Sequence, residues 1–235
     1  MYFSDIVFIF QWWVMFFAIG VIFLPLTTAI FSNFFDRGYI FSKIIGVIFI
    51  SYFVFVLGIL KILPFEKLNI FLVITIFLLI NLFFVKVKVR PWLRLNFKTD
   101  WKIFLFEEIL FLSTLIFWSY IRAHQPDIHG LEKFMDFGFI NSISRSDYFP
   151  PKDMWFTPFS INYYYFGHLV TAVLTKLSNI PSSITYNLML STIFAFTFTG
   201  AFSIGANLVR AGDASRAWRV FDPECSDRRG DALGG

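Results

Sequence analysis

The chain has 235 residues, of which 57% are hydrophobic, 22% aromatic and only 15% charged, and its formal net charge is +4. Its mean hydropathy of +0.67 lies far above the range of soluble domains, so the composition indicates an integral membrane protein and excludes a soluble one. The basic residues form no soluble basic face, which argues against a nucleic-acid partner.

The apolar segments predict an all-α fold, a polytopic transmembrane bundle of about six helices with one large loop that carries short helices. A helix needs roughly 20 apolar residues to cross a hydrocarbon core of about 30 Å. Segments of suitable length and composition are expected to form spans near residues 6–30, 41–60, 68–85, 103–121, 163–177 and 184–209. The first partner that these spans predict is the lipid bilayer.

The orientation follows from the connection between residues 86 and 102, which sets six cations against the single acid Asp100. Such an excess of Lys and Arg marks a cytoplasmic connection. We therefore expect the loop 122–162 to be extracytoplasmic, the N-terminus to lie on the same side as that loop, and the protein to reside in the plasma membrane. The same count places Arg37 and Lys43 inside and Arg210 outside.

The composition changes abruptly near residue 210. Residues 1–209 form the predicted membrane domain, whereas residues 210–235 contain no lysine, use Arg for every cation and are rich in Ala, Gly and Asp. We expect this segment to be a foreign tail, either disordered or an artefact of a shortened reading frame. The single cysteine, Cys225, excludes an intramolecular disulfide.

Two acids, Glu107 and Glu108, lie inside a predicted span. They are roughly 10 Å below its cytoplasmic edge at 1.5 Å per residue. Ionisable groups at that depth are costly, so they either snorkel or pair with a neighbouring helix near the interface, or they serve a function. Both interpretations are open from the sequence.

The polar stretch from residue 122 to 168 holds all three histidines and a cluster of carboxylates. If a helix runs through residues 131–139, His129, Glu132 and Asp136 share one face. Such a stripe could bind a divalent cation such as magnesium or manganese, or it could supply a general base. The alternative is that Glu132 and Asp136 are surface charges beside Lys133. The identity of any metal is unknown at this point.

The string FPPKDMWFTPFSINYYYFGH at residues 149–168, with PDIHGLEKFMD before it, resembles the YYY family of polytopic membrane proteins of bacteria and archaea. The resemblance is close over residues 122–168 and covers the rest of the first 209 residues only as hydrophobic helices. Family members are much longer, so we expect this chain to be an N-terminal fragment. One departure is Phe134, where the family pattern has a proline.

The resemblance implies a relation to the GT-C superfamily of membrane glycosyltransferases, which use acids in an outer loop to transfer a sugar from a polyprenyl-phosphate donor. A lipid-linked sugar donor is therefore the implied second partner. The implied catalytic acids are Asp127, Glu132 and Asp136, and the sequence leaves open which one is the base. The implied substrate-binding residues are Arg122, Lys133, Arg145, Tyr163, Tyr164, Tyr165 and His168.

Two other classes of function compete with this one. A transporter or channel component would use the loop carboxylates to attract a cation, with Glu107 and Glu108 along its path. Carriers place their polar groups near the bilayer midplane on interrupted helices, whereas here they cluster in a loop. A structural assembly subunit would need the loop acids only for folding.

Overall fold

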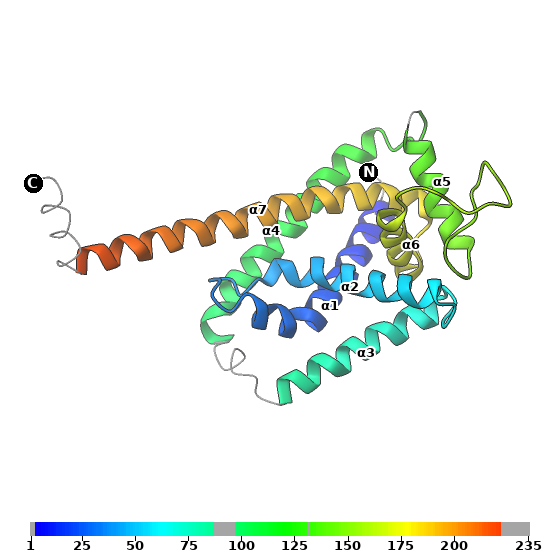
Figure 1. Cartoon of the computed structure of the whole chain (residues 1–235). Coiled ribbons are helices and arrows are strands. Elements are labelled where there is room, and N and C mark those ends of the chain that lie inside the picture. Colours follow the sequence, from blue (N-terminus) through cyan, green and yellow to red (C-terminus); the bar gives the residue numbers. More distant parts are fainter. Residues whose placement is uncertain (1–2, 87–96, 131, 222–235) are drawn as a thin grey trace, which may run out of the picture.

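The computed structural model describes residues 3–86, 97–130 and 132–221. Within these residues the chain forms helices and no strand, and a long irregular loop precedes α6 (Figure 1). In chain order the helices are α1 (Phe3–Ile30), α2 (Tyr39–Ile59), α3 (Lys67–Lys86), α4 (Phe97–His124), α5 (Glu132–Arg145), α6 (Phe166–Ser178) and α7 (Ser182–Phe221).

Four helices are long and apolar enough to cross a membrane. Their candidate spans are Ser4–Ile30, Tyr39–Ile59, Trp101–His124 and Ser182–Ala211, and a shorter apolar segment covers Lys67–Phe83 of α3. The predicted fold class, a helical membrane bundle, is confirmed. The last helix, α7, continues past residue 209 to Phe221, so it includes the first part of the segment that differs in composition. Residues 222–235, with Cys225, lie outside the described residues.

The predicted span over residues 163–177 is wrong. The helix in this region, α6, has 13 residues, which at 1.5 Å per residue makes it roughly 20 Å long, short of the hydrocarbon core. It ends at Asn179, whose φ of 59° is left-handed, and Pro181 follows. Its apolar residues, among them Leu169 and Leu174, are buried inside the protein. The segment is apolar because it packs against other helices.

The bundle has two ends, which we call the loop end and the opposite end. At the loop end, the loop after α5 is tied to the turn between α2 and α3. The Phe65 amide donates a hydrogen bond to the Asp147 carbonyl at 2.6 Å, and the Phe149 amide donates to the Gly58 carbonyl at 3.4 Å. These bonds fix the loop on the end of the membrane helices.

At the opposite end, the turn between α1 and α2 meets the far part of α7. The Phe35 amide donates to Asn207 Oδ1 at 2.9 Å, and the Arg210 guanidinium lies 5.8 Å from the centre of the Phe35 ring. Because α6 does not span, α7 runs from the loop end to the opposite end. The expectation that Arg210 lies on the same side as the loop is therefore wrong. Residues 87–96 of the basic connection lie outside the described residues.

The core is built around α1, whose Trp12, Phe16 and Phe23 are fully buried. The Trp12 indole N–H donates to Thr192 Oγ1 of α7 at 2.8 Å, so even this buried polar group has a partner. The approach of α2 to α1 depends on Gly46, because a Cβ there would lie 2.5 Å from Cγ2 of Ile19.

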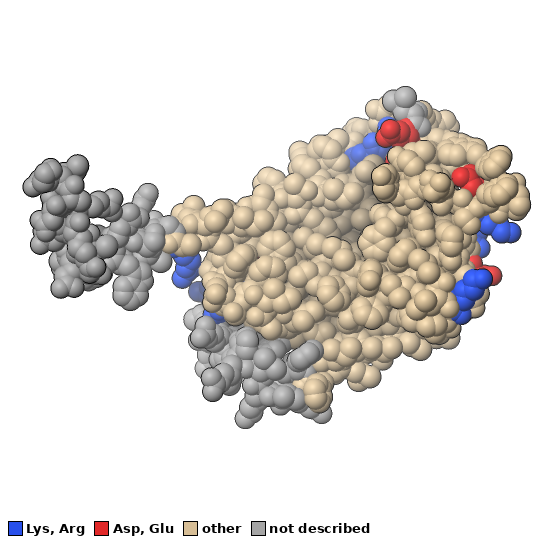
Figure 2. All heavy atoms as spheres, in the orientation of Figure 1, with Lys and Arg blue, Asp and Glu red and all other residues tan. Residues whose placement is uncertain are grey.

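Charged side chains are distributed as a bilayer requires. On the face that Figure 2 shows, the charged groups of the described residues gather towards the two ends and leave the middle of the bundle uncharged. Lys43 and Glu108 lie within the spans but do not face lipid, because they are buried and pair with each other inside the protein. Lys43 Nζ lies 2.5 Å from Glu108 Oε2, and the Tyr39 hydroxyl donates to the same oxygen at 2.6 Å. For Glu108, pairing with a neighbouring helix is therefore confirmed.

Candidate functional site at the loop end

Asp136 and His168 meet at the loop end, one from α5 and one from α6. His168 Nε2 lies 3.0 Å from Asp136 Oδ1, and the two side chains are 19% and 35% exposed respectively. The contact is a hydrogen bond with a neutral imidazole and an ion pair when the ring is protonated. The other ring nitrogen, Nδ1, is buried and has no hydrogen-bond partner among the described residues. The pair is thus partly exposed, and Nδ1 of the imidazole ring is left without a hydrogen-bond partner among the described residues.

Aromatic rings surround this pair. The buried Phe139 ring lies edge-on to the His168 ring at 5.4 Å, and it also touches the rings of Tyr163 at 5.9 Å and Trp155 at 6.2 Å. Trp155 and Tyr163 are more than half exposed. Exposed aromatic faces beside a carboxylate are suited to stack on the apolar face of a sugar ring.

The loop is held against α5 by close packing at Gly138. A Cβ at this position would lie 2.0 Å from Sδ of Met154, so a larger residue here would force the Met154 side chain to move. Asp153 then shapes the tip of the loop, because its Oδ1 accepts hydrogen bonds from the amides of Trp155 at 2.8 Å and Phe156 at 3.0 Å. A local structural role therefore accounts for Asp153.

The three tyrosines have three different environments. Tyr163 belongs to the aromatic surroundings of the pair, whereas Tyr164 is 87% exposed. Tyr165 is half-buried and packs its ring 5.9 Å from that of Phe55 on α2, and burial raises the pKa of the Tyr165 hydroxyl. Tyr165 therefore anchors the start of α6, and Tyr163 and Tyr164 remain accessible.

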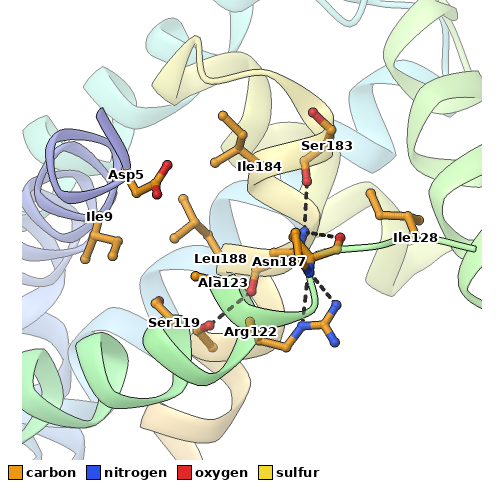
Figure 3. A pocket seen from close by; sticks show the side chains of 12 residues that line it. Asp5, Ile9, Ser119, Arg122, Ala123, Ile128, Ser183, Ile184, Asn187 and Leu188 are labelled. Atoms are coloured by element: carbon orange, nitrogen blue, oxygen red, sulfur yellow. Dashed lines mark hydrogen bonds between the residues drawn. The ribbon is translucent and has the colours of Figure 1, made fainter. Parts of the chain in front are cut away.

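Arg122 lines a cavity of about 380 Å³ between α1, α4 and α7, and neither Asp136 nor His168 belongs to the residues that line it (Figure 3). The Nε and Nη2 atoms of Arg122 donate to Asn187 Oδ1 at 3.1 and 2.5 Å. Asp5 of α1, Ile128 and Leu188 form further parts of the wall. Tyr186 of α7 is buried and packs its ring 6.1 Å from that of Phe137 on α5, so α7 links the wall of the cavity to the helix that carries Asp136.

The remaining candidate residues are more dispersed. Asp127, Glu132 and Arg145 are exposed and Lys133 is half-buried, and among the described residues no hydrogen bond or ion pair holds these four side chains. The helix predicted through residues 131–139 is confirmed as α5 from Glu132 onwards. The predicted stripe with His129 is wrong, because Gly130 has a φ of +87° and His129 precedes the helix.

The donor set for a divalent cation is not assembled in the described part of the chain. No three His, Cys, Asp or Glu side chains come together there in a way that could hold a metal ion. Of the three predicted ligands His129, Glu132 and Asp136, no two are in contact within the described residues, and Asp136 contacts His168, which was predicted to bind substrate. We therefore derive no step through magnesium or manganese.

Sequence reasoning missed several residues of this region. Phe139 and Trp155 gave no signal, because aromatic residues are frequent throughout the chain. Asn187 was detectable in principle, since a polar amide inside an apolar span usually contacts another polar group. Asp5, in the first turn of α1, reaches the cavity only through the way that α1, α4 and α7 pack (Figure 3).

The helices and the site at their loop end define a multi-span helical membrane protein with a polar site at one end. Residues 49–221 match the family described as "Uncharacterized membrane protein (DUF2298)", and the chain belongs to this family. The match includes α5, α6 and the whole loop between them. No curated protein and no solved structure matches the chain.

Proposed function

We propose that this protein takes part in membrane glycosyl transfer of the GT-C kind, moving a sugar from a polyprenyl-phosphate donor to an acceptor hydroxyl. The contact between Asp136 of α5 and His168 of α6, in the segment whose motif resembles the YYY family, is the observation that carries the proposal. A half-exposed carboxylate that is oriented by a histidine has the geometry of a general base.

In this reaction Asp136 takes the proton of the acceptor hydroxyl. The acceptor oxygen forms its bond to the anomeric carbon while the bond from that carbon to the phosphate oxygen breaks, and the lipid phosphate leaves with the electron pair. His168 is a positioning residue, because its Nε2–H donates to Oδ1 and leaves Oδ2 of Asp136 for the acceptor. Asp136 is thereby favoured as the base over Asp127 and Glu132, which no neighbour orients.

Arg122 is the cation best placed for the lipid phosphate. Asn187 holds its guanidinium at the wall of the cavity, and the N–H groups that Asn187 does not use can donate to phosphate oxygens. The cavity walls also contain Ile9, Ile184 and Leu188, which suit an apolar chain next to the phosphate. Trp155, Tyr163 and Tyr164 offer accessible aromatic faces for the sugar.

The loop end is proposed to face away from the cytoplasm in the plasma membrane. The support is the excess of cations between residues 86 and 102, a connection that joins α3 and α4 at their far ends from the loop. The polyprenyl-phosphate sugar donor would then be used at the outer surface of the membrane.

The test is sugar transfer in membranes of cells that express the protein from its own gene. A set of labelled polyprenyl-phosphate sugars is supplied, and transfer is compared between wild type, Asp136→Asn and Asp147→Asn. Loss of a general base costs about 10² to 10⁴ in rate, whereas Asp147 is exposed on the same loop and serves as the matched control. Normal transfer by Asp136→Asn would remove the catalytic role. Absence of any turnover in wild type would favour a carrier or scaffold.

A further inference from the structure

The cavity between α1, α4 and α7 begins at the depth where lipid headgroups lie. Its charged lining residues are at the loop ends of their helices, since Asp5 lies in the first turn of α1 and Arg122 in the last turn of α4. Ile9 on α1 and Ser119 on α4 line the cavity about one turn further into the bundle. The cavity therefore continues from the membrane surface towards the apolar interior. Its volume of about 380 Å³ is in the range of small-ligand sites, roughly 300 to 1,000 Å³.

One buried hydroxyl in the wall of this cavity has no partner. Ser119 is 6% exposed, and its Oγ makes no hydrogen bond within the described residues. Other polar groups of the wall are satisfied. The Ser191 hydroxyl donates to the Asn187 carbonyl at 3.1 Å, and Asn187 Nδ2 donates to two backbone carbonyls, both at 3.1 Å. Because buried polar groups are normally hydrogen-bonded, the unpaired Ser119 hydroxyl in a cavity wall indicates a bound ligand.

The two charged groups of the cavity are opposite in sign and lie on different sides of it (Figure 3). Asn187 Oδ1 holds Nε and Nη2 of Arg122, so the remaining N–H groups of this guanidinium can donate to an anion. A carboxylate has several acceptor positions, so Asp5 can accept from a cationic ligand group and keep its contacts within the chain. Among the described residues that line the cavity, the charges of Asp5 and Arg122 cancel. This lining is complementary to a zwitterion.

We propose that this cavity binds the headgroup of a phospholipid that carries a phosphate and a primary ammonium group, as phosphatidylethanolamine does. Ser119 and Arg122 are three residues apart on α4 and share one face, so both donate to the phosphate, and the ammonium group donates to Asp5. The acyl chains lie next to the apolar wall residues Ile9 and Leu188. The site shares Arg122 with the proposed sugar donor, whose phosphate would displace the phospholipid, and it does not depend on sugar transfer.

Native mass spectrometry of the full chain tests this without any sugar substrate. The protein is mixed with equal amounts of phosphatidylethanolamine, phosphatidylglycerol and phosphatidylcholine that have the same acyl chains. Phosphatidylethanolamine should bind best, because phosphatidylglycerol lacks the ammonium group and phosphatidylcholine has no N–H to donate to Asp5. Equal binding of the three lipids to the wild-type protein would overturn the proposal, and this comparison needs no variant. Free phosphoethanolamine that binds as tightly as the lipid would exclude a lipid as the source of the headgroup and also overturn it.

Variants of the lining residues test the contacts one by one. Arg122→Gln should weaken binding of phosphatidylethanolamine about 10- to 100-fold, and Ser119→Ala about 2- to 10-fold. Asp5→Asn should remove the preference for phosphatidylethanolamine over phosphatidylglycerol, because the acceptor for the ammonium group loses its charge. The matched control is Lys152→Gln, which changes an exposed cation of the loop outside the cavity. An Asp5→Asn protein with the wild-type preference, or a loss in Lys152→Gln as large as that in Arg122→Gln, would overturn the assigned site.

Discussion

Asp136 and His168 are 32 residues apart in the chain, yet Oδ1 of the first lies 3.0 Å from Nε2 of the second. The contact exists because the loop between α5 and α6 folds back on itself. Hydrogen bonds from Phe65 and Phe149 tie this loop to the turn after α2 and to its last residues. The site therefore depends on the membrane helices below it, and changes in their packing should affect both stability and the site.

The packing of α1 against α2 gives the first prediction. In Gly46→Ala, the new Cβ would lie 2.5 Å from Ile19 Cγ2 and 2.9 Å from Phe23 Cδ2. Such overpacking costs about 1 to 3 kcal/mol. The matched control is Gly205→Ala on α7, where no atom lies within 4 Å, and alanine should be neutral or stabilising by up to about 1 kcal/mol. The free energy of unfolding in bicelles measures both, and equal effects would contradict the close approach.

The buried ion pair gives the second prediction. Lys43→Met leaves the Glu108 carboxylate buried without its cation, which costs about 3 to 5 kcal/mol. The double variant Lys43→Met/Glu108→Gln should recover part of this loss, because no unpaired charge remains. Lys67→Met changes an exposed lysine and serves as the control. A double variant less stable than Lys43→Met, measured by the same unfolding experiment, would show that burial of an unpaired charge is not the cause.

The orientation of the bundle gives the third prediction. Single cysteines replace the exposed Asn162 in the loop and the exposed Asn33 in the α1–α2 turn, in a Cys225→Ala background. An impermeant maleimide should label Asn162→Cys in intact cells and label Asn33→Cys only after permeabilisation. The reverse pattern would place the loop in the cytoplasm. Labelling of both positions in intact cells would contradict the fold, which puts them at different ends.

The fourth prediction concerns Lys176 on α6. Burial lowers the pKa of its ammonium group, and the charges of Asp147 and Glu66 oppose this effect. Because the folded pKa lies below the unfolded one, the unfolded chain binds more protons in that window, so this residue makes stability rise with pH between the lowered pKa and about 10.5. Asp147→Asn should lower the pKa further. NMR of ¹³C-methylated lysine follows it, and a raised pKa in that variant would contradict the assignment.

Part of this structure could be predicted from composition and spacing alone. The spans of α1, α2, α4 and α7 follow from long apolar runs, and the start of α5 follows from Gly130 and the periodic pattern after it. Apolar composition also predicted a span over α6, because a helix buried against other helices and a helix that faces lipid look alike in sequence. Because α6 does not cross the membrane, Arg210 lies at the opposite end of the bundle from the loop.

The partners inside the site could not be predicted. Asp136 had several equally suitable neighbours in the polar stretch, and only the fold of the loop selects His168 over His129. Asp36 is a single acid in a short turn and belongs to no motif, so its hydrogen bonds with Ser203 and Asn207 come from the packing of α7 against that turn. Contacts between segments that are far apart in the sequence depend on the tertiary structure, and residue spacing alone does not predict them.

A double-mutant cycle tests most directly whether Asp136 and His168 act as one unit in sugar transfer. The rate of transfer from a labelled polyprenyl-phosphate sugar is measured for wild type, Asp136→Asn, His168→Gln and the double variant. If His168 acts only by orienting Asp136, the double variant should be as slow as Asp136→Asn alone, about 10² to 10⁴ below wild type. Losses that simply multiply would contradict the coupled pair, and an Asp136→Asn protein with wild-type turnover would contradict the site itself.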